Sequence, residues 1–320
     1  MNISVLGSGR WASFLAWYAD RIGHSVMLRG REDSEGFRRL SLYRQNEYLQ
    51  LGKNIRLTAS VREAVVFSDY ILISINAQNL RELTGELSSL PVSCKTFILC
   101  MKGLEAASGK RLSEVISGEI GNAAGIAVWV GPGHVQDFIK GIPNCMVISS
   151  QDKNLTKILV EMFAGDIIRF YYGDDLIGTE IGAASKNVIG IAAGMLDGLK
   201  ASSLKGALMA RGASEISRLI RTMGGDERTA YGLSHLGDYE ATLFSPFSHN
   251  REFGEKYVLG QQFGKLAEGA DTVQALHRLS VMHRVELPIC NTVYDILVEK
   301  KNPYDALIEL FMRPLKKEFW

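Results

Sequence analysis

This chain has few prolines and few cysteines, and neither sign of charge is in clear excess. Only 7 of its 320 residues are proline, against 32 glycines, which points to turns and close backbone approaches rather than flexible linkers. Thirty-six lysine and arginine residues against 35 aspartate and glutamate residues give a formal net charge of +1. A chain so close to neutral has no overall field to attract nucleic acid or an anionic membrane surface. Any cation of functional importance must act locally.

The cysteines and the apolar runs exclude further classes of protein. Cys94, Cys100, Cys145 and Cys290 form no CxxC pair and no metal-like cluster with the six histidines, so we expect neither a metal site nor a disulfide framework. This cysteine usage fits a reducing, cytoplasmic setting. The most apolar stretch, Asn187–Leu196, is far shorter than the ~20 residues that span a bilayer. The sequence therefore predicts no transmembrane helix.

The length and the hydrophobic pattern predict two domains. At roughly 150 residues per domain, 320 residues correspond to about two, and a hydrophobic fraction of 46% suffices for two cores. Up to residue 173, short β-branched runs alternate with helical patterns, which predicts a Rossmann-type, doubly wound and mainly parallel sheet in residues 1–173. The expected strands are Ile3–Leu6, Val26–Leu28, Ile55–Thr58, Tyr70–Ile75, Thr96–Met101, Ile126–Val130, Met146–Ser149 and Ile167–Tyr172.

From residue 174 onward only helical patterns remain, so residues 174–320 are expected to form an all-helical second domain. Asp174 is the expected cap of a helix that runs to about Leu199. This helix is rich in glycine, at a cost of about 1 kcal/mol each relative to alanine, which predicts that another backbone packs very close to it. Further helices are expected at Leu204–Met223, Thr272–His283 and Pro288–Lys300.

A glycine motif, Gly7-Ser8-Gly9-Arg10-Trp11-Ala12, follows the first expected strand and opens a helical pattern. Gly7 permits a tight turn, Gly9 lets the backbone approach a pyrophosphate, and Ala12 allows close packing of helix on strand. With a second strand after the helix, this order is typical of a dinucleotide site. An ordinary strand-to-helix turn is the alternative explanation.

The residues after the second strand bear on the choice of cofactor. An NAD site normally carries an acidic residue there, whereas this chain has Arg31, which can hold a 2′-phosphate bidentately. This favours NADP over NAD. Glu32 and Asp33 follow at once, so a shift of register would reverse the preference, and Arg31 could also be a solvated loop cation.

Two lysines and one aspartate are candidates for chemistry. Lys102 follows a strand at the edge of the sheet where ligands bind in parallel α/β folds. Lys186 lies in a helix with no other charge between Glu180 and Asp197, so it should be paired or have a lowered pKa, and a desolvated lysine can transfer protons near neutral pH. Asp238 is a plausible charge partner. Each also has an ordinary explanation: a surface lysine, a lysine that snorkels to solvent, and a helix cap.

Two further segments could contact a ligand through backbone and polar groups. Gly131-Pro132-Gly133 ends a strand in the same way as Lys102 and could present backbone N–H groups. Ser248-His249-Asn250-Arg251 stands before a helical run, where side chains and unpaired N–H donors could hold a phosphate. Taken singly, these are also a turn and a capped helix start.

Taken together, these motifs resemble bacterial NAD(P)-dependent glycerol-3-phosphate dehydrogenase over nearly the whole chain. The similarity rests on the glycine motif, Lys102-Gly103-Leu104-Glu105, the helix around Lys186-Asn187-Val188-Ile189, Leu236-Gly237-Asp238 and the segment from Ser248 to Gly254. It implies a C-terminal domain like that of 6-phosphogluconate dehydrogenase. It also implies reversible reduction of dihydroxyacetone phosphate to sn-glycerol 3-phosphate for glycerophospholipid synthesis, with a homodimer as a possible assembly.

The resemblance also assigns expected roles to residues. Lys186 would donate and accept the proton at the substrate oxygen. The expected substrate contacts are Lys102, Gly131, Gly133, Asp238, Ser248, His249 and Asn250. The expected contacts to NADP or NAD are Gly7, Ser8, Gly9, Trp11, Arg31, Lys102, Val135, His249, Leu266 and Glu268.

Three positions depart from the family pattern. His249 stands in place of an arginine that grips phosphate and cofactor, which leaves Arg251 or another cation to substitute. Gly133 replaces a serine, and Asn76-Ala77-Gln78 replaces a Val-Pro-Ser type loop. Two alternatives therefore stay open: a two-domain 3-hydroxyacid-type dehydrogenase for a carboxylated substrate, and an NAD(P)-binding paralogue with weakened catalysis.

Overall fold

The computed structural model describes residues 1–121, 124–315 and 317–318. Within them, eight strands form one sheet in the order β3-β2-β1-β4-β5-β6-β7-β8. Every neighbouring pair is parallel except β6 and β7, which confirms a mainly parallel, doubly wound sheet. The strands are β1 (Asn2–Leu6), β2 (Ser25–Arg29), β3 (Arg56–Thr58), β4 (Tyr70–Ile73), β5 (Thr96–Leu99), β6 (Gly125–Val130), β7 (Asn144–Ser150) and β8 (Ile168–Gly173).

Helices cover both faces of the sheet, because its strands are apolar on both sides. One face carries an aromatic-rich core that includes Phe14 of α1 and Phe163 of α7. The other face is covered by α3, α4 and α5, with Val65, Leu83 and Val115 in its core. The helices of this part are α1 (Arg10–Arg21), α2 (Glu35–Tyr43), α3 (Val61–Phe67), α4 (Leu80–Ser88), α5 (Leu112–Ile120), α6 (Val135–Phe138) and α7 (Lys153–Phe163).

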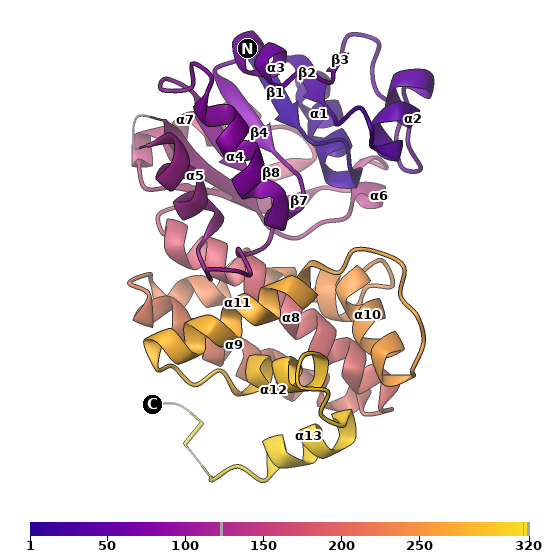
Figure 1. Ribbon diagram of the computed structural model, residues 1–320, viewed down its shortest axis with the longest axis vertical. Coiled ribbons are helices and arrows are strands. Elements are labelled where there is room, and N and C mark those ends of the chain that lie inside the picture. Colours follow the sequence, from indigo (N-terminus) through magenta and orange to yellow (C-terminus); the bar gives the residue numbers. More distant parts are fainter. Residues whose placement is uncertain (122–123, 316, 319–320) are drawn as a thin grey trace.

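After β8 the described chain is helical, and the two parts are stacked along the long axis of the molecule (Figure 1). The α-helices here are α8 (Leu176–Gly198), α9 (Lys205–Thr222), α10 (His249–Val258), α11 (Glu268–His283), α12 (Pro288–Leu297) and α13 (Pro303–Phe311). Two short turns matter for the site: η4 (Leu236–Asp238) and the π-helical η5 (Glu240–Phe244).

Helix α8 joins the two parts. Leu176 and Ala183, in its first half, belong to a core of the sheet, whereas its second half lies in the core of the helical part. A Cβ at Gly194 would lie 1.9 Å from the Arg251 carbonyl oxygen, and one at Gly254 would lie 2.1 Å from that of Ile191. Glycine thus permits α8 and α10 to cross in backbone contact, which confirms the close approach predicted from the glycine content.

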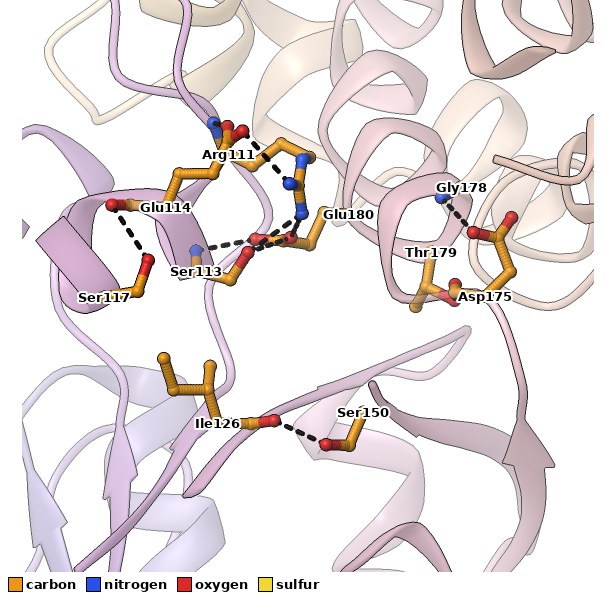
Figure 2. Close-up of polar contacts among 10 residues, drawn as sticks. All are labelled: Arg111, Ser113, Glu114, Ser117, Ile126, Ser150, Asp175, Gly178, Thr179 and Glu180. Carbon is orange, nitrogen blue, oxygen red and sulfur yellow. Dashed lines mark hydrogen bonds and ion pairs between the residues drawn. The ribbon is translucent and has the colours of Figure 1, made fainter. Parts of the chain in front are cut away.

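Several predicted boundaries need correction. The cap of α8 is Asp175, whose carboxylate accepts a hydrogen bond from the Gly178 N–H, so the prediction of Asp174 was wrong by one residue (Figure 2). Strand β5 ends at Leu99, three residues before Lys102, and α13 was not predicted. No helix in the described part of the chain is long and apolar enough to cross a membrane.

Candidate active site

A cleft of about 620 Å³ lies between the sheet and the helical part. It opens at the carboxyl ends of β1 and β4, where the strand order reverses and where parallel α/β folds bind ligands. Residues of α8, η5, α10 and the start of α11 close its other side. Residues of both the sheet-bearing part and the helical part therefore line the cleft.

The β1–α1 turn forms one wall. Gly7 has φ +133°, and a Cβ there would lie 2.1 Å from the Ser74 carbonyl oxygen after β4, so only glycine fits between these strands. At Gly9 a Cβ would meet nothing within 4 Å. The N-terminus of α1 thus faces open space beside a bare backbone, which fits the pyrophosphate of a dinucleotide.

Arg31 lies just beyond β2 and lines the same cleft. Its side chain is 60% exposed, and its Nε is 3.6 Å from the Asp33 carboxylate. At this distance and exposure the ion pair is weak, so the guanidinium is available to an incoming phosphate.

Lys102, Asp238 and Lys186 form a compact charge cluster in the same cleft. The same oxygen, Asp238 Oδ2, lies 2.7 Å from Lys102 Nζ and 2.8 Å from Lys186 Nζ. Asp238 is 2% exposed, Lys186 9% and Lys102 20%. Two ammonium groups around one carboxylate leave a local charge of +1 that faces the cleft, where an oxyanion would be stabilised.

The environment of Lys186 suits proton transfer. Its pKa is lowered from 10.5 to about 8, mainly by burial; Asp238 opposes this shift, and the nearby Lys102 adds to it. The Lys186 ammonium also donates to Thr242 Oγ1 at 2.8 Å, and that hydroxyl donates to the Asp238 carbonyl at 2.7 Å. Thr242, on η5, therefore fixes the direction of the amine, and no sequence signal had singled it out.

The loop that carries Lys102 is held from two sides. The Asn187 side chain donates to the Lys102 carbonyl at 2.8 Å, which ties the loop to α8. The Gln78 amide donates to the Leu104 carbonyl at 2.9 Å, and its oxygen accepts from the Ala106 N–H at 2.9 Å. The departure at Asn76-Ala77-Gln78 thus supplies hydrogen bonds that position this loop.

The start of α10 provides polar groups at the cleft. Ser248 caps the helix, His249 and Asn250 line the cleft, and Asn250 Oδ1 accepts from the Gly269 N–H at 3.0 Å. Arg251 turns away, with Nη1 2.6 Å from Asp197 and 3.0 Å from Glu255. The expectation that Arg251 could replace the missing arginine is wrong, because it lies two residues, or about 200° of helix turn, beyond His249 and pairs with Asp197 at the end of α8.

The two glycines after β6 act differently from each other. The Gly131 carbonyl accepts a hydrogen bond from Lys102 Nζ at 2.7 Å, so Gly131 holds the lysine, although it does not line the cleft. Gly133 lines the cleft at φ +137°, and a Cβ there would lie 2.4 Å from the Phe138 ring. Since Phe138 occupies that space, a serine at position 133 is excluded here.

The structure brings almost all predicted site residues together. Apart from Gly131, the following predicted residues line the cleft: Gly7, Ser8, Gly9, Trp11, Arg31, Lys102, Gly133, Val135, Lys186, Asp238, Ser248, His249, Asn250, Leu266 and Glu268. Three residues without a predicted role line the cleft too: His134, Thr242 and Arg10. Only Arg10, inside the glycine motif, carried a signal that could have identified it.

A protonatable amine beside a dinucleotide crevice, enclosed between a sheet and a helical part, defines a two-domain NAD(P)-dependent dehydrogenase. Within that class, the chain belongs to the NAD-dependent glycerol-3-phosphate dehydrogenase family. The model of the family's N-terminal part matches residues 2–156, and that of its C-terminal part matches residues 175–308.

Relatives match along the full length. The chain is 34% identical to a glycerol-3-phosphate dehydrogenase [NAD(P)+] of Thermoanaerobacter sp., over 99% of both chains. It is 35% identical to one of Chlorobium phaeobacteroides, over 100% of both. The solved glycerol-3-phosphate dehydrogenase of Coxiella burnetii has a TM-score of 0.90 at 29% identity, covering 98% of this chain and 99% of the other.

Proposed function

We propose that the protein catalyses the reversible reduction of dihydroxyacetone phosphate to sn-glycerol 3-phosphate with NAD(P)H. Family membership over the full length supports this assignment. The single observation that carries the chemistry is the cluster in which Asp238 Oδ2 lies within 2.8 Å of both Lys102 Nζ and Lys186 Nζ.

The nicotinamide cofactor supplies or accepts the hydride when it is bound. Reduction of the ketone leaves negative charge on the substrate oxygen, so a nearby ammonium must stabilise and then protonate it. Lys186 takes this role in the proposal, because its pKa of about 8 lets it give and regain a proton near neutral pH. Lys102 keeps a second positive charge close to the same oxygen.

The remaining roles follow from position in the cleft. Ser248, His249 and Asn250 at the start of α10 are proposed to bind the substrate phosphate, together with Lys102 and Asp238 at the reacting end. The glycine turn, Trp11, Val135, Leu266 and Glu268 are proposed cofactor contacts. We also propose that the nucleotide-binding and helical domains divide near residue 173, between β8 and α8.

The cofactor preference follows from the charge beyond β2. Arg31 lines the cleft and has only a long contact to Asp33, so we propose that it binds a 2′-phosphate and that NADPH is preferred. Within the cell, we propose a cytoplasmic homodimer that supplies glycerol 3-phosphate for phospholipid synthesis. Sedimentation analysis of the purified protein measures the assembly.

Turnover with each nucleotide tests both proposals. The purified protein should oxidise NADPH when dihydroxyacetone phosphate is added, and Arg31→Ala should raise the Kd for NADPH by roughly tenfold while that for NADH changes little. Arg62→Ala, an exposed arginine of α3 outside the cleft, is the control. Absence of turnover with either nucleotide contradicts the enzymatic assignment, and turnover with carboxylated hydroxy acids instead supports the alternative dehydrogenase.

A further inference from the structure

Arg10 is the first residue of α1, directly after Gly9, and it lines the cleft. Its side chain is half-buried, and its guanidinium carbon lies 5.6 Å from the centroid of the Tyr48 ring, which lines the cleft as well. A guanidinium over an aromatic face is held by cation–π attraction, which leaves its N–H groups available. Arg10 is thus a positioned cation inside the nucleotide cleft.

This cation has no acceptor in the described part of the chain. In residues 1–121, 124–315 and 317–318, the Arg10 guanidinium makes no hydrogen bond and no carboxylate lies within ion-pair distance. By contrast, Lys102 and Lys186 share Asp238. A guanidinium offers five N–H donors in a planar fork that matches phosphate oxygens.

Arg10 also acts across the cleft. Burial lowers the pKa of His249, and the positive charges of Arg10 and Lys265 lower it further. At Glu268 burial raises the pKa, while Lys102, Lys186 and Arg10 oppose it. His249 and Glu268 begin α10 and α11, so the charge of Arg10 reaches the helical wall that faces the glycine turn.

On the helical wall at this point, the cation Lys265 is already paired with the Glu252 carboxylate at 3.1 Å. With its pKa lowered below 6.5, the His249 imidazole is mainly neutral at pH 7. Arg251, two residues further on, is bound to Asp197 and Glu255. A diphosphate that lies between the two walls would therefore meet the Arg10 guanidinium, on the sheet side of the cleft.

We propose that Arg10 binds the pyrophosphate of NAD(P)(H) through its guanidinium and supplies the positive charge that His249 does not. The inference rests on the proposed function, because it needs a dinucleotide in the cleft. The pyrophosphate is assigned rather than the substrate phosphate because Arg10 follows the open backbone at Gly9, whereas Lys102, Asp238 and Lys186 lie at the reacting end.

Nucleotide titration without substrate tests the inference. Arg10→Ala should weaken NADH and NADPH by the same factor, roughly 10- to 100-fold, because both carry the pyrophosphate. Arg10→Lys should recover part of the loss, and the dependence of NADH binding on salt should become shallower in Arg10→Ala. The KM for dihydroxyacetone phosphate at saturating NADPH should stay within about twofold of the wild-type value.

The matched control is Arg39→Ala, an exposed arginine of α2 outside the cleft. Equal nucleotide Kd values for Arg10→Ala and this control overturn the inference. A loss confined to NADPH assigns Arg10 to the 2′-phosphate, and a raised KM with unchanged Kd values assigns it to the substrate phosphate. Both outcomes overturn the pyrophosphate assignment.

A double variant tests whether a guanidinium on the helical wall can replace that of Arg10 on the sheet side. His249→Arg in the Arg10→Ala background should restore most of the lost NADH affinity, since it returns a guanidinium to the opposite side. No recovery in a variant that melts like the wild type contradicts the claim that Arg10 compensates for His249. Wild-type protein that binds neither nucleotide refutes the proposed function itself, whereas normal wild-type binding with an unaffected Arg10→Ala refutes only this inference.

Discussion

At the scale of single residues, Lys186 shows how burial and one counter-charge together determine the pKa of a lysine. Its ammonium is almost fully buried, yet it keeps Asp238 at 2.8 Å and the Thr242 hydroxyl at 2.8 Å. Burial lowers the pKa of Lys186 more than Asp238 raises it, which leaves a value of about 8. The charged and neutral forms are therefore both accessible near neutral pH.

The pH profile should report this lysine. Ketone reduction needs the protonated amine, so its rate should fall as pH rises through about 8, while oxidation of glycerol 3-phosphate should rise over the same range. Lys186→Ala should lower kcat by roughly 10²- to 10⁴-fold with little change in the Kd for NADPH. Stopped-flow rates from pH 6 to 10 measure both, with Lys157→Ala, an exposed lysine of α7, as the control. A reduction rate that increases through pH 8 would contradict the assignment.

The environment of Lys186 could be predicted from the sequence, whereas the orientation of Arg251 could not. A lone charge in an apolar helix predicted that Lys186 is paired or has a lowered pKa. The lysine lies 2.8 Å from Asp238 Oδ2, and its pKa is lowered to about 8. Nothing local predicted the orientation of Arg251, because one helical position decides whether a side chain faces the cleft or Asp197.

At the scale of elements, the crossing of α8 and α10 determines the distance between Lys186 and the start of α10. Gly194 and Gly254 place the two backbones in contact, as the positions of their absent Cβ atoms show. Ser248, His249 and Asn250 are thereby brought to the cleft that Lys186 lines. The glycines that weaken α8 as an isolated helix make this contact possible.

Alanine at Gly194 should separate these helices. Its Cβ would lie 1.9 Å from the Arg251 carbonyl oxygen, and we expect a loss of about 1–3 kcal/mol in the free energy of unfolding, together with a higher KM for dihydroxyacetone phosphate. Gly85→Ala in α4 is the matched control, because a Cβ there meets nothing within 4 Å and should be neutral or stabilising. Urea denaturation measures both, and equal stability of the two variants would contradict the packing argument.

At the scale of the whole molecule, a buried ion pair fixes α8, which carries Lys186, to the sheet-bearing part. Glu180, in the first turns of α8, accepts hydrogen bonds from Arg111 Nη1 at 2.7 Å and from the N–H and hydroxyl of Ser113 at 2.9 and 2.5 Å (Figure 2). Arg111 and Ser113 stand at the start of α5. Because Lys186 is six residues further along α8, this contact sets where the lysine meets the cleft.

Removal of the Glu180 charge should affect stability and catalysis together. Glu180→Gln leaves the buried Arg111 without its main counter-charge and should cost about 3 kcal/mol in the free energy of unfolding, with a lower kcat. Glu119→Gln removes one half of the exposed pair with Arg81 and should cost less than about 1 kcal/mol. Chemical denaturation and steady-state kinetics measure these effects, and equal losses in the two variants would show that the buried pair is not a special constraint.

The sequence by itself determined the elements and the chemical types. Alternating apolar runs predicted the mainly parallel sheet, and the glycine motif predicted the β1–α1 turn. The family resemblance of the motifs around Lys102, Lys186 and Asp238 implied a dehydrogenase site. These signals are local, since strand and helix periods and glycine turns depend on neighbouring residues.

Only the tertiary structure decided how these groups meet. Lys102 and Asp238 are 136 positions apart, and they come within 2.7 Å because α8 packs on the sheet while Gly182 and Gly190 admit the segment that carries Asp238. The same packing directed Arg251 to Asp197 and placed the Thr242 hydroxyl 2.8 Å from Lys186 Nζ. It also left Arg10 at the cleft without a hydrogen-bond acceptor or counter-ion in the described chain. Such contacts depend on side-chain direction and on helix crossings, which no short stretch of sequence encodes.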